Sequence, residues 1–368
     1  MPTLSDLVTR FPLVPRPRPA CSPLPQRVRA LAGLAQTARD SSNSSAASAV
    51  YNQAALLASD VGLPGLAREW CQQHAEIYMG AAPFPAPTAI HALEPVINLA
   101  RLRIRAGDPQ DGLERLLHLV QAVSDGNPAT FDGVRVPADL THSPADRKKV
   151  RDWLWRVLLA DGSRTLTSAG RWVEAHTHVR MWKGVGRRML DGRQIAIVAA
   201  LTSDSTDEAA RLIADTAPRD PWEHAVTACL AALRRLACAE LDTAQTNKLT
   251  DTVLAILSEH GQVVFQTRLG LTAMKLLPAA DTATARRITD RIHSRILDAD
   301  DGFAAREALA DPMFHHLVGP VQRTELRVLV SASGLRTGLL PSPLHSDLNA
   351  AMELSTGVLR NALGAKDV

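Results

Sequence analysis

The sequence predicts an all-α protein made of many short helices. Hydrophobic residues make up 46% of its 368 residues, but aromatic residues make up only 4%. Alanine and leucine lose little conformational entropy in a helix and let helices pack closely, whereas sheets favour β-branched and aromatic residues. Apolar residues also recur with a helical period in successive segments, and short turns rich in Gly, Pro, Asp and Ser separate these segments.

Helices are expected to follow a proline-rich arm and to alternate with short turns. Residues 1–25 contain seven prolines and no sustained period, so we expect an extended or disordered arm. Helices are then expected at residues 26–40, 46–61, 64–78, 89–106 and 110–123, followed by an ordered loop at 126–144. Further helices are expected at residues 145–161, 165–169, 171–183, 190–201, 206–215 and 222–239. The C-terminal third adds expected helices at residues 244–260, 265–277, 281–298, 303–310, 321–331 and 346–362.

An internal repeat runs through the first part of the chain. Four stretches each contain a helix, a short polar turn and a second helix with a small residue near its start, which lets the two helices pack closely. A turn residue stands five positions before the small residue in each of four pairs: Gly62 and Ala67, Gly107 and Gly112, Gly170 and Ala175, and Asp204 and Ala209. Ala175 and Ala209 are 34 residues apart, and Pro221 follows where a hairpin would end.

One of these stretches carries a family resemblance. Gly170–Ala175 has the sequence G-R-W-x-E-A, and with the 34-residue period and the terminal proline it resembles the tetratricopeptide repeat (TPR). The resemblance covers about residues 46–221, and spacings of 45 and 63 residues between the other small residues indicate insertions. It implies a TPR-like helical-hairpin solenoid over residues 26–221, with an additional C-terminal helical region over residues 222–368. An irregular helical bundle is the alternative.

The resemblance also implies where a ligand would bind. In TPR proteins the first helices of the hairpins line a concave groove that holds extended peptides, often through their carboxylates. The facing positions precede the turn residue by six, nine or ten residues, and several of them carry polar side chains that can bind a peptide: Asn52, Asn98, Arg101, Arg164 and Gln194. Leu56 and Val198 occupy comparable positions, so a complete carboxylate clamp is not expected.

Positive charge is concentrated in the middle of the chain. Between Arg147 and Arg193 there are twelve lysine or arginine residues and four acidic residues, a local net charge of +8 in a chain with a net charge of +3. Bidentate arginine contacts suit phosphates and carboxylates, so we expect a basic patch for an anionic partner. Its predicted members are Lys148, Arg151, Trp155, Arg180, Lys183, Arg187 and Arg188. A solvated basic face without a partner is the alternative.

The stretch KGVGRRMLDGRQ, from Lys183 to Gln194, contains a G-x-G motif. A dinucleotide-binding loop would need a third glycine where Met189 stands and a strand before the motif, but a helix is expected there. A phosphate-binding Walker loop would need a Gly-Lys-Ser/Thr ending. We therefore expect a joint between two hairpins, in which Gly184 and Gly186 end one helix through a left-handed cap and Leu190 begins the next.

No residue pattern predicts catalysis, a cofactor or a metal site. The common nucleophile and metalloprotease motifs are absent. His176 and His178 are two residues apart and point in different directions on a helix. Cys71 and His74 share a helix face, but two ligands are too few for a zinc site. We expect these side chains to pack between helices.

These observations favour a non-catalytic protein-interaction or adaptor module that binds an acidic or C-terminal peptide segment. Nucleic-acid binding or transcriptional regulation through the basic patch is the second hypothesis, and an enzyme with an unrecognised helical pocket is the third. No apolar run approaches the roughly 20 residues that span a bilayer, and the first residues lack the apolar run of a signal peptide. We therefore expect a cytoplasmic protein without a membrane segment. Self-association into a homo-oligomer stays open.

Overall fold

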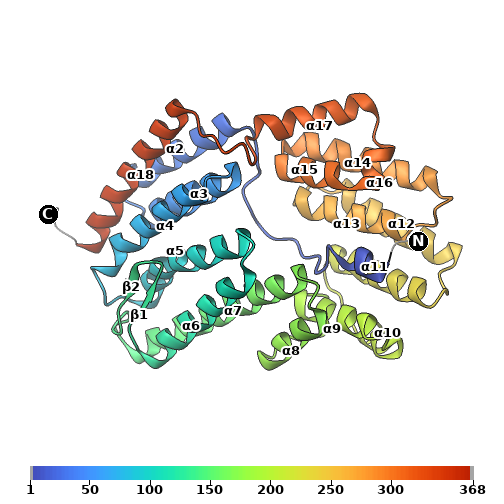
Figure 1. The fold of residues 1–368 in the computed structure, drawn as a ribbon, viewed down its shortest axis with the longest axis horizontal. Helices are drawn as coiled ribbons and strands as arrows, with labels where there is room; N and C mark the ends of the chain where they lie inside the picture. Colours follow the sequence, from blue (N-terminus) through green and yellow to red (C-terminus); the bar gives the residue numbers. More distant parts are fainter. Residues whose placement is uncertain (1–2, 365–368) are drawn as a thin grey trace. The chain divides into compact units, whose positions relative to one another are not determined.

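The computed structural model describes residues 3–364, which form eighteen helices and one short β-hairpin (Figure 1). The predicted all-α class is confirmed. Most helices that are consecutive in the sequence pack against each other, as they do in helical-repeat proteins. None of the described helices is both long and apolar enough to cross a membrane.

Contacts divide the chain into two compact units, and each unit consists of two segments that are distant in the sequence. Unit 1 comprises Met1–Pro23 and Gly162–Ser333, and unit 2 comprises Leu24–Asp161 and Gly334–Val368. The N-terminal arm therefore belongs to unit 1, although the helix that follows it belongs to unit 2. The segments predicted from the sequence pattern have other boundaries, at residues 25 and 221.

Unit 2 is a series of helices closed by the C-terminal helix. Its helices are α2 (Leu24–Asp40), α3 (Ser44–Val61), α4 (Pro64–Met79), α5 (Ala86–Arg105), α6 (Pro109–Asp125), most of α7 (Pro144–Ser168) and α18 (Ser342–Leu363). Helix α18 packs against α2, α3 and α4. The end of the chain thus covers apolar faces at the beginning of this unit.

Helix α7 is continuous from Pro144 to Ser168, whereas the sequence pattern predicts separate helices at 145–161 and 165–169. Gly162 and Ser163 indicate a break, because glycine and serine weaken an isolated helix. Both residues are buried, so tertiary packing outweighs the local preference. The predicted break is wrong.

A β-hairpin lies within the predicted loop at residues 126–144. Strands β1 (Ala129–Phe131) and β2 (Val134–Val136) pair antiparallel across an Asp-Gly turn in which both residues have positive φ, the backbone that two-residue hairpins need. The carboxylate of Asp132 accepts hydrogen bonds from Arg103 (3.0 Å) and Arg115 (3.2 Å). These contacts fix the hairpin against α5 and α6.

Unit 1 contains the remaining helices. They are α1 (Leu4–Val8), α8 (Trp172–Met181), α9 (Asp191–Thr202), α10 (Thr206–Ala214), α11 (Pro221–Ala237), α12 (Thr243–Ser258), α13 (Val263–Leu276), α14 (Thr282–Ala299), α15 (Gly302–Ala310), α16 (Pro312–Leu317) and α17 (Pro320–Ala332). Alternate helices also meet, because α11 contacts both α9 and α13, and α13 contacts α15. The sequence pattern does not predict α1 or α16.

The repeated turn and small residue have a common structural cause. Four turn residues have left-handed backbone: Gly62 (φ +92°), Gly107 (φ +92°), Gly170 (φ +71°) and Asp204 (φ +55°). The small residues that follow lie where two helices meet: Ala67, Ala175 and Ala209 are fully buried, and Gly112 faces α5. Each left-handed residue ends the first helix of a hairpin and returns the chain along it.

The first helices of the unit 2 hairpins run parallel to one another. Three hydrogen bonds connect α3 to α5 between residues 46 apart: Ser45 with His91 (3.2 Å), Asn52 with Asn98 (3.0 Å) and Ser59 with Arg105 (3.0 Å). Two bonds connect α5 to α7 between residues 60 apart: Ala86 with Asp146 (3.0 Å) and Arg101 with Asp161 (2.9 Å). A constant separation along two helices requires a parallel arrangement. The second separation is larger because the β-hairpin loop lies between α6 and α7.

The joint at Lys183–Gln194 lies between α8 and α9, as predicted, but its glycines have other roles. Lys183 carries the left-handed backbone (φ +53°), whereas neither Gly184 nor Gly186 has positive φ. The constrained glycine is Gly192 in α9, because a Cβ atom there would stand 2.1 Å from the Gly184 carbonyl oxygen. The predicted glycine cap is therefore wrong, and close approach of two backbone segments explains Gly192.

We expect Gly112→Ala to lower the free energy of unfolding by about 1–3 kcal/mol. An added Cβ atom would stand 2.4 Å from Ile104 Cγ1 and 2.9 Å from the Ala100 carbonyl oxygen. Gly33→Ala in α2 is the matched control, because nothing lies within 4 Å of its Cβ position and alanine should stabilise that helix by up to about 1 kcal/mol. Urea titration measures both changes, and equal stabilities would contradict the close approach of α5 and α6.

Candidate functional site

Three of the predicted peptide-binding residues meet on the parallel helices of unit 2. Asn52 donates to Glu94 (2.8 Å), and Asn98 donates to Asn52 (3.0 Å). Arg101 donates to Asn98 (3.1 Å) and, through Nε, to Asp161 (2.9 Å). We call these five residues the polar ladder. It crosses three successive first helices, α3, α5 and α7, without interruption.

The polar ladder combines fixed and accessible groups. The Asp161 side chain is 5% exposed and anchors Arg101, whose side chain is still 44% exposed. Asn52 and Asn98 are half-buried, so their amides are oriented by each other at the edge of solvent. Amide groups held in this way can both donate and accept. The arrangement therefore provides an ordered row of hydrogen-bonding groups with a guanidinium at one end.

His91 extends the polar ladder toward the start of α5. Its Nε2 atom lies 3.2 Å from the Ser45 hydroxyl, and its Nδ1 atom lies 3.6 Å from the Glu94 carboxylate. The nearby Glu94 carboxylate raises the pKa of His91 above its ordinary value, and burial opposes this rise. Arg164, predicted for the same groove, is exposed on the part of α7 that belongs to unit 1.

The fifth predicted residue, Gln194, binds the N-terminal arm. Its side chain is fully buried in α9. Its Oε1 atom accepts from the Leu13 backbone N–H (2.6 Å), and its Nε2 atom donates to the Leu13 carbonyl (2.8 Å) and to the Met189 carbonyl (3.0 Å). One amide thus satisfies both backbone groups of an extended residue, which is the contact that the TPR resemblance implies for a peptide ligand.

The arm, residues 3–23 in the described chain, is ordered against unit 1. Its Leu4–Val8 segment is helix α1, which contacts α9 and α13, and no helix forms between residues 9 and 23. Four apolar side chains of the arm are buried: Leu7, Val8, Phe11 and Leu13. We call the surface that this part of the arm contacts the arm-binding face; it comprises α9 and α13, with Glu307 of α15 and Asp311 at the start of α16.

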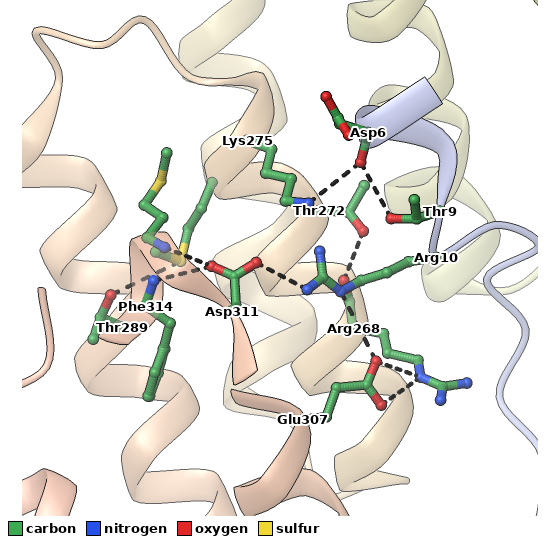
Figure 2. A network of polar contacts seen from close by, with 12 residues as sticks. Asp6, Thr9, Arg10, Arg268, Thr272, Lys275, Thr289, Glu307, Asp311 and Phe314 are labelled. Carbon is green, nitrogen blue, oxygen red and sulfur yellow. Dashed lines mark hydrogen bonds and ion pairs between the residues drawn. The ribbon is translucent and has the colours of Figure 1, made fainter. Parts of the chain in front are cut away.

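Charged groups fix the arm at Asp6 and at Arg10, next to Phe11 (Figure 2). Arg10 donates to Asp311 (2.9 Å) and lies 3.9 Å from Glu307, which also pairs with Arg268 on α13 (2.8 Å). The Lys275 ammonium donates to the Asp6 carbonyl (3.3 Å). The arm therefore places the positive Arg10 side chain between Glu307, near the end of α15, and Asp311, at the start of α16.

A second anchor holds the arm near Cys21, which is fully buried. Its carbonyl accepts hydrogen bonds from the Gly302 N–H (2.8 Å) and the Ser333 hydroxyl (2.9 Å), and its N–H lies 3.3 Å from the Asp301 carboxylate. A Cβ atom at Gly302 would stand 2.2 Å from the Ser333 hydroxyl oxygen. Glycine is therefore required there for Ser333, which holds the Cys21 carbonyl, to approach α15.

The sequence contains signals for these anchors that the periodicity does not reveal. The segment from Arg10 to Arg16, RFPLVPR, alternates proline with apolar and basic residues, which is typical of extended segments that dock on another surface. Asp311 precedes a proline, and its carboxylate caps α16 through the N–H groups of Met313 and Phe314 (both 3.0 Å). An Asp-Pro pair is a helix start signal.

The predicted basic patch falls into two groups. Lys148, Arg151 and Trp155 lie in unit 2, and the lysine and arginine are exposed while the tryptophan is half-buried. In unit 1, Arg180 and Lys183 are exposed at the end of α8. Arg187 and Arg188, the other two predicted members, bind acidic residues of the same unit.

Arg188 neutralises a buried carboxylate. It bonds Glu223, whose side chain is fully buried, and Asp220 (2.6 Å). Burial alone would raise the pKa of Glu223, but the hydrogen bonds from Arg188 and from the Met189 N–H hold it below its ordinary value. Arg187 instead forms an exposed pair with Asp215 (2.8 Å). Arg188 is therefore part of the packing between the joint and α11.

The residues considered for metal binding have packing roles. The His74 ring is buried, lies 2.9 Å from the Ser48 hydroxyl and stacks on Tyr51, and burial lowers its pKa to about 3. Burial likewise raises the pKa of the Cys71 thiol to about 12. Within residues 3–364, no group of three or more His, Cys, Asp or Glu side chains is placed to hold a metal ion.

Comparison with protein-family models found no match, and searches of the curated proteins and of the solved structures found none either. The functional assignment therefore rests on the contacts of the polar ladder and the arm-binding face.

We expect Arg188→Ala to lower the free energy of unfolding by about 3 kcal/mol at pH 7, because it leaves the buried Glu223 carboxylate without its counter-charge. Arg187→Ala is the matched control and should cost less than about 1 kcal/mol, since its pair is exposed. The Glu223 carboxylate stabilises the fold above its ordinary pKa of 4.5, and this stabilisation is lost as the pH falls through its lower folded value. The difference in the free energy of unfolding between the two variants, measured by urea titration, should therefore become smaller as the pH is lowered. A constant difference from pH 7 to pH 4 would contradict the assigned pair.

Proposed function

We propose that this protein is a non-catalytic, TPR-like interaction or adaptor module that binds an extended segment of a partner protein across its parallel first helices. The observation that carries the proposal is the polar ladder, which joins Asn52, Asn98 and Arg101 across α3, α5 and α7. These residues come from helices that are far apart in the sequence, and their hydrogen bonds join them into one connected row.

The chemistry of an extended peptide matches such a row. A peptide without secondary structure has unpaired N–H and C=O groups, and binding must replace the water that bonds them. Side-chain amides supply both donors and acceptors at fixed positions. The bonds between Gln194 and the Leu13 backbone, 2.6 and 2.8 Å long, support this mode of recognition within the same chain.

The charge at the end of the polar ladder favours a carboxylate in the partner. Arg101 keeps 44% of its side chain exposed while Asp161 orients it. A guanidinium that is already oriented loses less entropy when it binds a carboxylate. We therefore propose an acidic or C-terminal segment as the ligand of this surface.

Replacing Asn52 and Asn98 together by alanine should weaken partner binding by about tenfold or more, because each amide hydrogen bond contributes roughly 1 kcal/mol. The measurement is a pull-down from the native host with nuclease present, followed by titration of the retained partner. Gln73→Ala removes an exposed amide from α4 and is the control, which should bind like the wild type. A double variant that retains the same partners with unchanged affinity, and the same helicity, would contradict the proposal.

Nucleic-acid binding is the second candidate, favoured by the exposure of Lys148, Arg151, Arg180 and Lys183. Replacing all four by alanine should abolish retention of a labelled single-stranded RNA at low salt and reduce the slope of log affinity against log salt by about 3. This set avoids Arg188, whose loss would destabilise the fold.

A control with the same change in charge separates local from general electrostatics. Four exposed basic residues of α12 and α14 suit it: Lys248, Arg286, Arg287 and Arg291. Their replacement by alanine should leave most of the RNA affinity intact. Wild-type protein that binds no RNA at low salt, or two variants that lose affinity equally, would exclude a specific role of the basic patch.

A further inference from the structure

The contacts of the arm define a sequence pattern. Phe11 and Leu13 are buried on either side of Pro12. Gln194 bonds the backbone N–H and C=O groups of Leu13, and any residue with extended backbone could make these two bonds. Two arginines complete the pattern, one three positions before Leu13 in the sequence and one three positions after it. Arg10 pairs with Asp311, and Arg16 pairs with Asp191 on α9. The pattern is arginine, aromatic, any residue, leucine, two residues of any type, arginine.

We propose that the arm-binding face is a site for partner segments with this basic and apolar pattern, and that the arm occupies it as an internal ligand which such a segment displaces. The proposal rests on the proposed function in one respect only, that the ligand is an extended segment of a partner protein. It concerns a different surface and a ligand of opposite charge from that of the polar ladder.

The groups that recognise the arm are held in place without it. The Asp311 carboxylate caps α16 through the N–H groups of Met313 and Phe314. Glu307 is paired with Arg268 on α13, and the Gln194 amide also bonds the Met189 carbonyl. Because each group has a second partner within unit 1, the face keeps its acidic and amide positions when the arm leaves. Such preorganisation is the property of a binding site.

The arm can leave the face without disturbing its second anchor. Residues 17–20, two of them prolines, are exposed between the buried Leu13 and the buried Cys21. Arg18 belongs to the second anchor, because its guanidinium lies 3.7 Å from the centroid of the Phe303 ring. Docking of the first part orders about a dozen residues, and this loss of conformational entropy offsets the gain from burying four apolar side chains. A competing segment that makes the same contacts therefore shifts the population.

The length of the chain favours a foreign segment over the arm of a second copy. With Cys21 anchored, the eight residues back to Leu13 span at most about 28 Å. A second copy would have to place its own arm-binding face within that distance of Cys21. A partner segment has no such restriction, whereas the internal arm competes with it at a high effective concentration.

The test uses the full chain and a fluorescein-labelled peptide with the sequence of residues 3–18. In the variant Phe11→Ser with Leu13→Ser the internal arm is weakened, so fluorescence anisotropy should report at least tenfold tighter peptide binding than in the wild type. Adding Asp311→Asn, which keeps the helix cap but removes the charge, should reduce that affinity about tenfold. A peptide of the same composition in scrambled order should not bind.

A second measurement keeps the proposal testable if the released variant does not fold. In the wild type, millimolar unlabelled peptide should increase hydrogen exchange at residues 7–13 while the exchange of α9 stays unchanged. Absence of any increase overturns the proposal, as does a folded variant that binds the two peptides equally or not at all. A wild-type dimer that the peptide dissociates would assign the face to a second copy and overturn the foreign ligand. None of these outcomes alters the test at Asn52 and Asn98, so failure of this proposal and failure of the proposed function are separable.

Discussion

The close approach of two helices behind a left-handed turn residue is the constraint on which the remaining structure depends. Where Gly107 turns the chain with φ +92°, Gly112 allows the backbone of α6 to lie against Ile104 and Ala100 of α5. Each hairpin of this kind sets the distance to the next, so the first helices run parallel at separations of 46 and 60 residues. That parallel order brings Asn52, a residue of one hairpin, to Asn98, a residue of the next.

Closure of each unit by a distant segment adds a second level of organisation. Helix α18 covers α2 and α3 in unit 2. In unit 1 the arm contacts α9 and α13 through α1, and Cys21 bonds Ser333, which is 312 residues away in the sequence. The polar ladder and the arm-binding face differ in chemistry. The polar ladder presents amides and Arg101, whereas the arm-binding face presents Gln194, Glu307 and Asp311 and already holds a basic segment. One fold thus offers two surfaces suited to extended segments of opposite charge.

The sequence predicts those features that depend on local chemistry. The helix class and the turns follow from periodicity and small residues. The TPR resemblance names five residues as peptide-binding, and that role stays a prediction: Asn52, Asn98, Arg101, Arg164 and Gln194. Features set by tertiary packing are not predictable in this way. Burial keeps Gly162 helical in α7, and an Asp-Gly turn forms a β-hairpin from strands too short to show a period. The acidic partners of Arg10 lie about 300 residues away, so no local pattern connects them to the arm.

Residue-resolved hydrogen exchange at Leu13 tests most directly whether a first-helix side chain holds an extended backbone. In the wild type, the Leu13 amide should exchange at least tenfold more slowly than an unstructured amide, because Gln194 Oε1 accepts its hydrogen at 2.6 Å. In Gln194→Met, which keeps the volume but not the amide, that protection should disappear while α9 and α10 remain protected. A Leu13 amide that exchanges at the unstructured rate in the wild type, or that is equally protected in both proteins, would contradict the claim that Gln194 holds the extended backbone of the arm.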